Sequence, residues 1–270
     1  MTGFPPTVAD IRAAHWREPV RAAYERPLLM NTYVFRPVSF FLTWAAIRVG
    51  LRSETVSWLS GIVGLAGCAV LLIPDSAALP LGLALLWLFN LLDCVDGDLA
   101  RTLRAQNAYG RFVDSVCGGV VDIAFWAVVG GMAYQHPDVL HWREGFGYGT
   151  QLWIAVGALT CFAYLIIELI ERAFEVHMKD LWMQATGRGL STTDDERPTR
   201  ARWIIRIVQR NVRVRETHYA LLVVACLTGT VDLLLVAYLL YYTIHACALL
   251  VIYRRRGVTT CLAPQMKAPE

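Results

Sequence analysis

The sequence predicts an all-α integral membrane protein with six transmembrane helices and an N-terminal amphipathic helix at the membrane interface. Apolar residues make up 56% of the 270 residues, above the roughly 45–50% of ordinary soluble domains. The mean hydropathy is +0.43. Several apolar runs reach or approach the ~20 residues that a spanning helix needs. We therefore expect the chain to cross the membrane several times.

Six apolar segments form the predicted spans. The fifth is short, and only Gly229-Thr230 separates it from the sixth. Ahead of the first span, Arg36–Leu51 mixes aromatic and aliphatic residues with two Arg, which favours a helix lying in the interface. The predicted spans are 55–73, 77–95, 111–134, 151–172, 217–230 and 231–253.

The distribution of basic residues predicts the orientation. If the N-terminus is cytoplasmic, Arg143 is the only one of the 25 Lys and Arg residues in an external loop. Because cytoplasmic loops carry an excess of Lys and Arg, this pattern predicts a protein of the cytoplasmic membrane with both termini in the cytoplasm. The start of the chain is polar and Arg-rich, so we expect no cleaved signal peptide.

The cysteines and the basic residues exclude two classes of site. None of the seven cysteines forms a CxxC pair, which favours small buried thiols over a disulfide framework or a zinc site. An Arg cluster that directly adjoins membrane spans is poor support for nucleic-acid binding, and the chain contains no nucleic-acid-binding motif. We expect no nucleic-acid partner.

Acidic residues gather where the second span meets the third, in LLDCVDGDLARTLRAQNAYGRFVDSVCGG. Asp93 and Asp96 are three residues apart and so share a helix face, while Asp114 lies one turn into the returning helix. An acid inside an apolar segment is expensive and indicates a functional site. Three carboxylates without a matching His or thiolate form an all-oxygen donor set, which suits Mg²⁺ or Mn²⁺.

Small residues and one arginine surround these acids. Gly97 and Gly110 bracket the turn, and Ala100 is small, so a ligand can approach the backbone closely. Arg101 supplies a guanidinium suited to phosphate oxygens. The pattern predicts a metal–diphosphate site open to the cytoplasm. The alternative is that the acids pair with Arg101, Arg104 and Arg111 as salt bridges at the helix ends.

This spacing resembles the signature of the CDP-alcohol phosphotransferase (CDP-alcohol phosphatidyltransferase) family of membrane enzymes. The matching pattern is Asp93-x-x-Asp96-Gly97-x-x-Ala100-Arg101, then eight residues, Gly110, three residues and Asp114. The resemblance implies six spans, commonly in a homodimer, with a polar cavity at the cytoplasmic face. It implies that an acceptor hydroxyl displaces CMP from a CDP-alcohol such as CDP-diacylglycerol.

The resemblance also implies roles for these positions. Metal ligands would be Asp93, Asp96 and Asp114, and Asp114 would also be catalytic. The residues that bind the cytidine diphosphate would be Asp93, Asp96, Gly97, Ala100, Arg101 and Gly110. The resemblance divides the chain into a cytoplasmic N-terminal segment (1–34), a membrane domain (35–255) and a cytoplasmic tail (256–270).

The sequence departs from the family pattern at one position. The resemblance leads us to expect a fourth Asp that binds a second metal and deprotonates the acceptor, but Gly118 stands there. Asp122 lies one turn further along, ~6 Å deeper. Asp122 could serve as the substitute base, or the acceptor could be ionised already. Another group such as Glu168, Glu171 or His177 could also serve, or the protein could be an inactive relative.

The segment 197–215 contains seven Arg and precedes His218. One interpretation is a solvated patch attracted to anionic lipid headgroups. The other is an anion-binding wall for the acceptor, with candidate residues Arg206, Arg210, Arg213 and His218.

Three functions remain open, and the first is favoured. It is a metal-dependent transferase of phospholipid synthesis that joins a CDP-alcohol donor to an alcohol acceptor, possibly a polyol phosphate. The second is a catalytically impaired relative that binds a CDP-alcohol as a regulatory or partner subunit. The third is a transporter or channel, which would spread its acids along a path through the membrane.

Overall fold

The computed structural model describes residues 5–143, 149–186 and 200–258, and every regular element in these ranges is a helix. The predicted all-α class is confirmed. The first elements are α1 (Val8–Trp16), α2 (Pro19–Glu25), the π-helical turn η1 (Asn31–Phe35), α3 (Arg36–Arg48), α4 (Ser53–Leu71), η2 (Ser76–Ala78) and α5 (Leu79–Thr102). They are followed by α6 (Ala108–Gln135), η3 (Pro137–Val139), α7 (Gln151–His177), α8 (Lys179–Thr186), α9 (Arg200–Arg213), α10 (Arg215–Thr228) and α11 (Val231–Gly257).

Within the described residues, five helices are long and apolar enough to cross a membrane. They are α4, η2 with α5, α6, α7 and α11. The remaining predicted span corresponds to α10, which has 14 residues and so rises roughly 21 Å, less than the ~30 Å of a hydrocarbon core. The count of six spans therefore stays a prediction. The predicted break between the last two spans is confirmed, because Gly229 ends α10 in the left-handed conformation at φ 66°.

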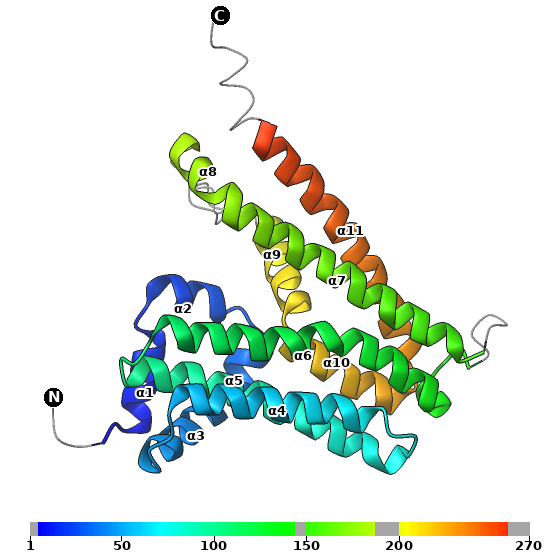
Figure 1. Ribbon diagram of the computed structural model, residues 1–270, viewed down its shortest axis with the longest axis horizontal. Coiled ribbons are helices and arrows are strands. Elements are labelled where there is room, and N and C mark those ends of the chain that lie inside the picture. The colour runs from blue at the N-terminus through cyan, green and yellow to red at the C-terminus, as the bar shows by residue number, and fades with distance from the viewer. Residues whose placement is uncertain (1–4, 144–148, 187–199, 259–270) are drawn as a thin grey trace, which may run out of the picture.

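Helices α4, α5 and α6 lie side by side, and α7 packs against α6 and α11 (Figure 1). Helix α3 occupies most of the predicted interfacial segment, and α1 packs against α3 and α5. Figure 1 shows α1 and α2 at the same end of the bundle as the turn between α5 and α6. The N-terminal helices are therefore neighbours of the acidic motif.

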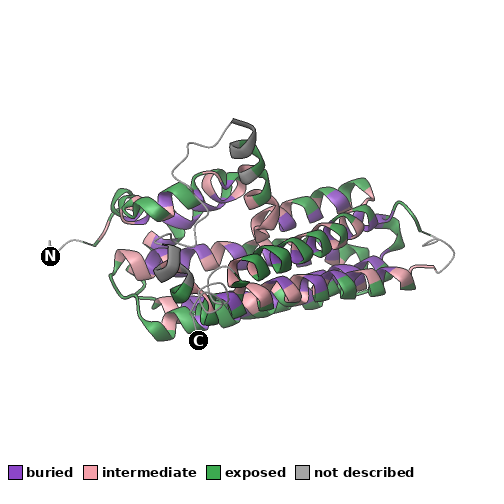
Figure 2. Ribbon diagram, turned by 90° about the horizontal axis from the view of Figure 1, so that it is seen from above, coloured by how far each residue is buried: buried purple, intermediate pink, exposed green. Residues whose placement is uncertain are grey.

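The outer faces of the long helices remain apolar. Figure 2 shows buried residues along the inner helix faces and exposed residues along the outer ones. The exposed residues include Leu227 (82% exposed), Leu169 (68%) and Ile244 (67%). An apolar surface of this extent indicates contact with lipid.

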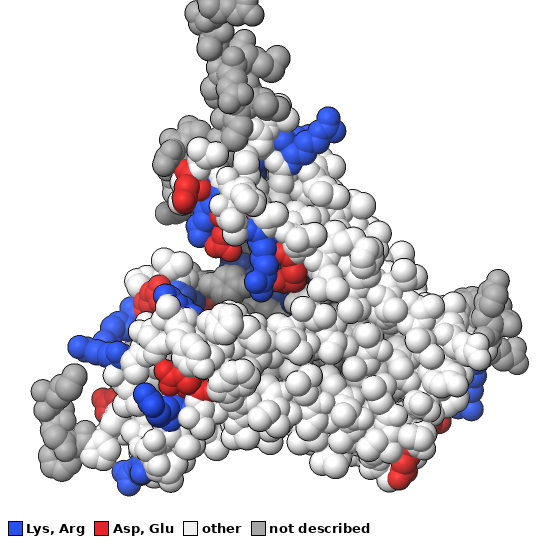
Figure 3. Space-filling model, viewed as in Figure 1, with Lys and Arg blue, Asp and Glu red and all other residues white. Residues whose placement is uncertain are grey.

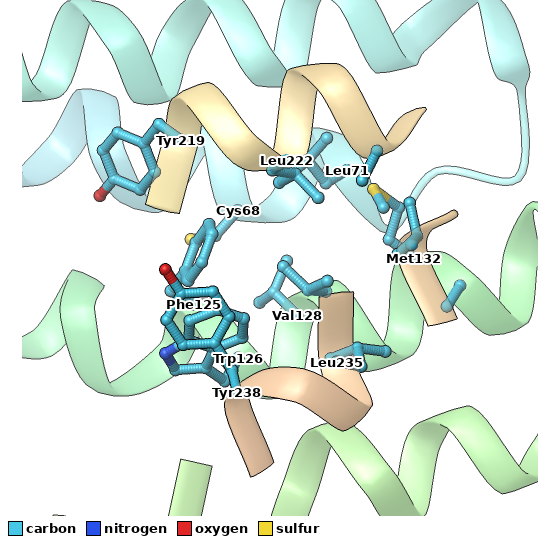
Figure 4. Close-up of a cluster of buried hydrophobic side chains, with 14 of the residues drawn as sticks. Cys68, Leu71, Phe125, Trp126, Val128, Met132, Tyr219, Leu222, Leu235 and Tyr238 are labelled. Atoms are coloured by element: carbon cyan, nitrogen blue, oxygen red, sulfur yellow. The ribbon is translucent and has the colours of Figure 1, made fainter. Parts of the chain in front are cut away.

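Aromatic side chains hold the short helix α10 in the bundle (Figure 4). Tyr219 of α10 is buried against Phe125 of α6, with ring centroids 5.2 Å apart. Trp126 of α6 packs on Tyr238 of α11 at 4.3 Å. Aromatic pairs at these separations contribute about 0.5–1.5 kcal/mol beyond their buried area. This packing fixes the N-terminal end of α10 beside α5 and α6.

Glycines let the long helices approach one another closely. A Cβ atom added at Gly64 of α4 would lie 2.7 Å from Val121 Cγ2 and 2.9 Å from Phe89 Cγ. At Gly157 of α7 it would lie 2.6 Å from the Gly130 Cα atom and 2.7 Å from the Trp126 carbonyl oxygen. Small residues at such positions are typical of helix interfaces in membranes.

We expect Gly157→Ala to lower the melting temperature in detergent, because its Cβ atom would meet backbone atoms of α6. Overpacking of this kind costs about 1–3 kcal/mol. The matched control is Gly119→Ala in α6, where an added Cβ atom meets nothing within 4 Å. An equal melting temperature for the two variants would contradict the close approach of α6 and α7.

Candidate functional site

The turn between α5 and α6 is held by local hydrogen bonds. Asn107 is the N-cap of α6, where its side chain accepts a hydrogen bond from the Gly110 backbone N–H at 2.7 Å. The Asn107 side-chain amide also donates to Glu54 Oε1 of α4 at 2.9 Å. Arg104 takes a left-handed conformation at φ 53°, which reverses the chain after α5. These contacts fix the two acidic helices relative to each other.

The predicted metal-binding acids come from both helices. Asp93 and Asp96 lie on α5 and Asp114 lies on α6, and the charge of Asp93 acts on both of the others. Asp96 is 4% exposed and accepts a hydrogen bond from Ser57 Oγ of α4 at 2.5 Å. Within the described part of the chain, no Lys or Arg nitrogen lies within 4.0 Å of the Asp96 or Asp114 carboxylate.

These acids form an open arrangement. In the residues that the structure describes, no three His, Cys, Asp or Glu side chains are gathered as a metal-binding group. The three carboxylates nevertheless repel one another, and in the described residues two of them, Asp96 and Asp114, have no basic nitrogen within 4.0 Å. Their hard oxygen donors suit Mg²⁺ or Mn²⁺, which retain several waters and bind through few carboxylates. The residues present therefore fit a divalent cation.

A first cavity of about 480 Å³ lies at the turn, and we call it the hairpin pocket. Its lining includes six of the seven positions of the sequence motif: Asp96, Gly97, Ala100, Arg101, Gly110 and Asp114. A Cβ atom added at Gly97 would lie 2.9 Å from Arg101 Nη2, so the glycine makes room for the guanidinium. The hairpin pocket thus combines small residues, three arginines (Arg21, Arg101 and Arg111) and two of the motif acids.

We call a second cavity, of about 300 Å³, the Arg215 pocket. Its lining includes Asp93, Asp122, Arg213, Arg215 and His218. Figure 3 shows charged side chains gathered around a hollow of the surface between α2 and α7, while most of the remaining visible surface carries neither sign. Asp93 lines the Arg215 pocket, whereas its neighbours Asp96 and Asp114 line the hairpin pocket.

Arg215 links two acids of different helices. Its Nη1 lies 3.2 Å from Asp93 Oδ1 and its Nη2 lies 3.2 Å from Asp122 Oδ2. Its guanidinium carbon is 5.1 Å from the centre of the Phe89 ring. A Cβ atom added at Gly118 would lie 3.0 Å from Arg215 Nη2. Sequence reasoning missed Arg215, because nothing local indicates a pairing across 122 residues.

Two of the predicted acceptor residues, Arg213 and His218, line the Arg215 pocket together. Arg213 lies 2.8 Å from Glu171 Oε1, and buried His218 contacts the Val212 carbonyl oxygen at 2.9 Å. Arg210 packs over the Tyr24 ring at 5.2 Å and is not among the lining residues of the Arg215 pocket. Arg206 lies in α9, but its side chain is outside the described residues.

The acids at the C-terminal end of α7 form ion pairs. Glu168 lies 3.8 Å from Arg172 Nε, and Glu175 lies 2.9 Å from Lys179 Nζ. These pairs, with the contact between Glu171 and Arg213, favour the interpretation of helix-end salt bridges over a catalytic role. His177 is exposed at the end of α7.

A buried network, also missed by sequence reasoning, joins the N-terminal helices to α5. His15 Nδ1 donates to Asp98 Oδ1 at 2.8 Å, and His15 Nε2 lies 3.0 Å from Glu25 Oε2. Asp98 also pairs with Arg101 at 2.7 Å and with Arg36 at 3.4 Å. Burial alone would raise the pKa of Glu25, but its contacts with His15 and Arg36 outweigh burial and lower the pKa. The network holds Arg101 at the hairpin pocket.

Comparison with known proteins places the motif in a family. The model of the family described as CDP-alcohol phosphatidyltransferase matches residues 52–188. A phosphatidylinositol phosphate synthase of Mycobacterium marinum is 29% identical over 132 residues, which cover 49% of this chain and 50% of that protein. A phosphatidylinositol phosphate synthase of Mycobacteroides abscessus is 28% identical over 133 residues, which cover 49% of this chain and 54% of that protein.

The chain thus spans about half the length of the curated relatives that it matches. No solved structure matches it.

We expect Asp98→Asn to destabilise the protein by about 3–5 kcal/mol, because it breaks a buried ion-pair network: Arg36 and His15 lose one of their two anionic partners, with only Glu25 left. The measurement is the melting temperature in detergent. The matched control is Glu175→Gln, which breaks an exposed pair worth about 0.3–0.5 kcal/mol. If both variants have the same melting temperature, the network does not stabilise the fold.

Proposed function

This chain belongs to the CDP-alcohol phosphatidyltransferase family, and we propose that it transfers a substituted phosphate from a CDP-alcohol to an acceptor hydroxyl, with release of CMP. The observation that carries the proposal is that the three motif acids line two pockets. Asp96 and Asp114 line the hairpin pocket, and Asp93 lines the Arg215 pocket. Two substrates can therefore meet at one group of carboxylates.

The hairpin pocket is the proposed donor site. Gly97 and Ala100 leave the α5 backbone accessible to the cytidine diphosphate, and Arg101 offers N–H donors to phosphate oxygens. Asp93, Asp96 and Asp114 would hold Mg²⁺ or Mn²⁺. Such an ion, when bound, neutralises charge on the diphosphate and on the CMP leaving group.

The Arg215 pocket is the proposed acceptor site. Arg213 and Arg215 favour an anionic acceptor, such as a polyol phosphate. The names of the two curated relatives, both phosphatidylinositol phosphate synthases, support a phosphorylated polyol. In the proposed step Asp122 takes the proton of the acceptor hydroxyl, the acceptor oxygen forms a bond to phosphorus, and the bond to CMP breaks. Asp114 lies on α6, as Asp122 does, and lines the hairpin pocket, the proposed donor site.

The setting of this reaction is also proposed. We infer a membrane domain over residues 35–255 that acts in the cytoplasmic leaflet, with both termini in the cytoplasm and a homodimer as the assembly. The five apolar helices and the exposed apolar residues on their outer faces support the membrane setting.

The test is CMP release by purified protein in detergent with CDP-diacylglycerol and Mg²⁺ or Mn²⁺. The acceptor panel contains polyols, polyol phosphates and serine. We expect release that requires one acceptor, with a phosphorylated polyol as the best. Metal-dependent cytidine nucleotide binding without any release would indicate another donor or the catalytically impaired relative.

Metal removal should abolish CMP release, and re-addition of Mg²⁺ or Mn²⁺ should restore it. We expect Asp93→Asn to lower the rate more than ~100-fold, because even residues that only orient a metal ligand cost about 10–100-fold when changed. CDP binding should weaken as well. Undiminished turnover in EDTA would exclude the metal-dependent mechanism.

We expect Asp122→Asn to lower turnover about 100-fold or more with CDP binding unchanged, because a general base contributes about 10²–10⁴-fold. The control is Glu175→Gln, whose carboxylate pairs with Lys179 away from both pockets. Full turnover of Asp122→Asn would instead support an already ionised acceptor or a base such as Glu168 or Glu171.

A further inference from the structure

The missing fourth acid of the motif leaves a space that another residue fills. Gly118 stands where the family pattern leads us to expect an aspartate. An added Cβ atom at Gly118 would come within 3.0 Å of Arg215 Nη2. The guanidinium therefore lies against the backbone of α6, where a side chain at position 118 would begin. In this chain the cationic side chain of Arg215 lies next to the position where the carboxylate of the expected aspartate would be.

Arg215 is bound on both sides. One guanidinium nitrogen contacts Asp93 and the other contacts Asp122, each at 3.2 Å. Phe89 lies beneath the guanidinium carbon at 5.1 Å, a cation–π contact that stabilises it further. Arg215 is the first residue of α10, and buried Tyr219 one turn later anchors that helix. An arginine in proteins stays protonated, so its charge is permanent.

The charges divide the acids into two pairs. Asp93 and Asp122 share the charge of Arg215, whereas Asp96 and Asp114 have no basic partner within 4.0 Å in the described part of the chain. Arg215 Nη1 contacts Asp93 at its Oδ1 atom. Asp96 and Asp114 would hold a divalent ion, and Asp93 would be its third acidic ligand. An ion between Asp93 and Asp122 would first have to displace the guanidinium.

We propose that Arg215 is a permanent cation of this site in place of a second divalent ion, so that the chain binds one divalent cation. The inference rests on the proposed function for the identity of the ion. It predicts a countable property of the protein, the number of Mn²⁺ ions bound per chain, which does not depend on turnover.

The experiment counts bound Mn²⁺ by the EPR signal of free Mn²⁺ during titration of the purified chain in detergent with CDP present. We expect one ion per chain for the wild type and for Arg215→Lys, which keeps the charge. The double variant Gly118→Asp with Arg215→Met restores the carboxylate and removes the cation, so we expect two ions. The control Arg213→Met removes a neighbouring arginine that pairs with Glu171, and should stay at one.

Melting temperature and CDP binding verify that each variant is folded. Two ions in the wild type would overturn the inference and leave the proposed function standing. A folded double variant that binds CDP and one ion would also overturn it. No bound Mn²⁺ in any variant would overturn the inference and the proposed metal dependence together.

Discussion

The compensation of buried carboxylates is the constraint on which the rest of this structure depends. Carboxylates in an apolar bundle are costly unless they are paired or hydrogen-bonded. Asp98 is surrounded by His15, Arg36 and Arg101, and Asp232 at the start of α11 accepts backbone N–H groups from His141 and Trp142. Asp93 and Asp122 share Arg215.

The exceptions to this compensation lie at the candidate site. Asp96 accepts a hydrogen bond from Ser57 but has no basic partner in the described part of the chain, and neither has Asp114. The fold supplies basic side chains for Asp98, Asp93 and Asp122 and backbone N–H groups for Asp232, whereas it leaves a cavity beside Asp96 and Asp114. The same physical requirement thus explains both the rigid parts of the protein and the place where a ligand is expected to bind.

The sequence predicted the features that depend on residues close together in the chain. Apolar runs indicated the long helices, and the spacing from Asp93 to Asp114 indicated a hairpin with its acids together. Contacts between distant segments could not be predicted, because periodicity and composition contain no information on which cation meets which acid. Arg215 could be recognised as one of seven arginines, but its position between Asp93 and Asp122 depends on how α10 packs against α5 and α6. His15 likewise looked like part of a polar N-terminal segment.

The contact between His15 and Asp98 has a consequence for how the protein is made. The two residues are 83 positions apart, and the ribosome produces α1 long before α5. Until α5 is synthesised and inserted, His15 lacks its Asp98 partner and α1 cannot complete its packing against α5. Chains fold from the N-terminus as they are synthesised, but here the first helices must wait for the second long apolar segment. The N-terminal end of the chain is therefore among the first parts to be synthesised and among the later parts to reach its final packing.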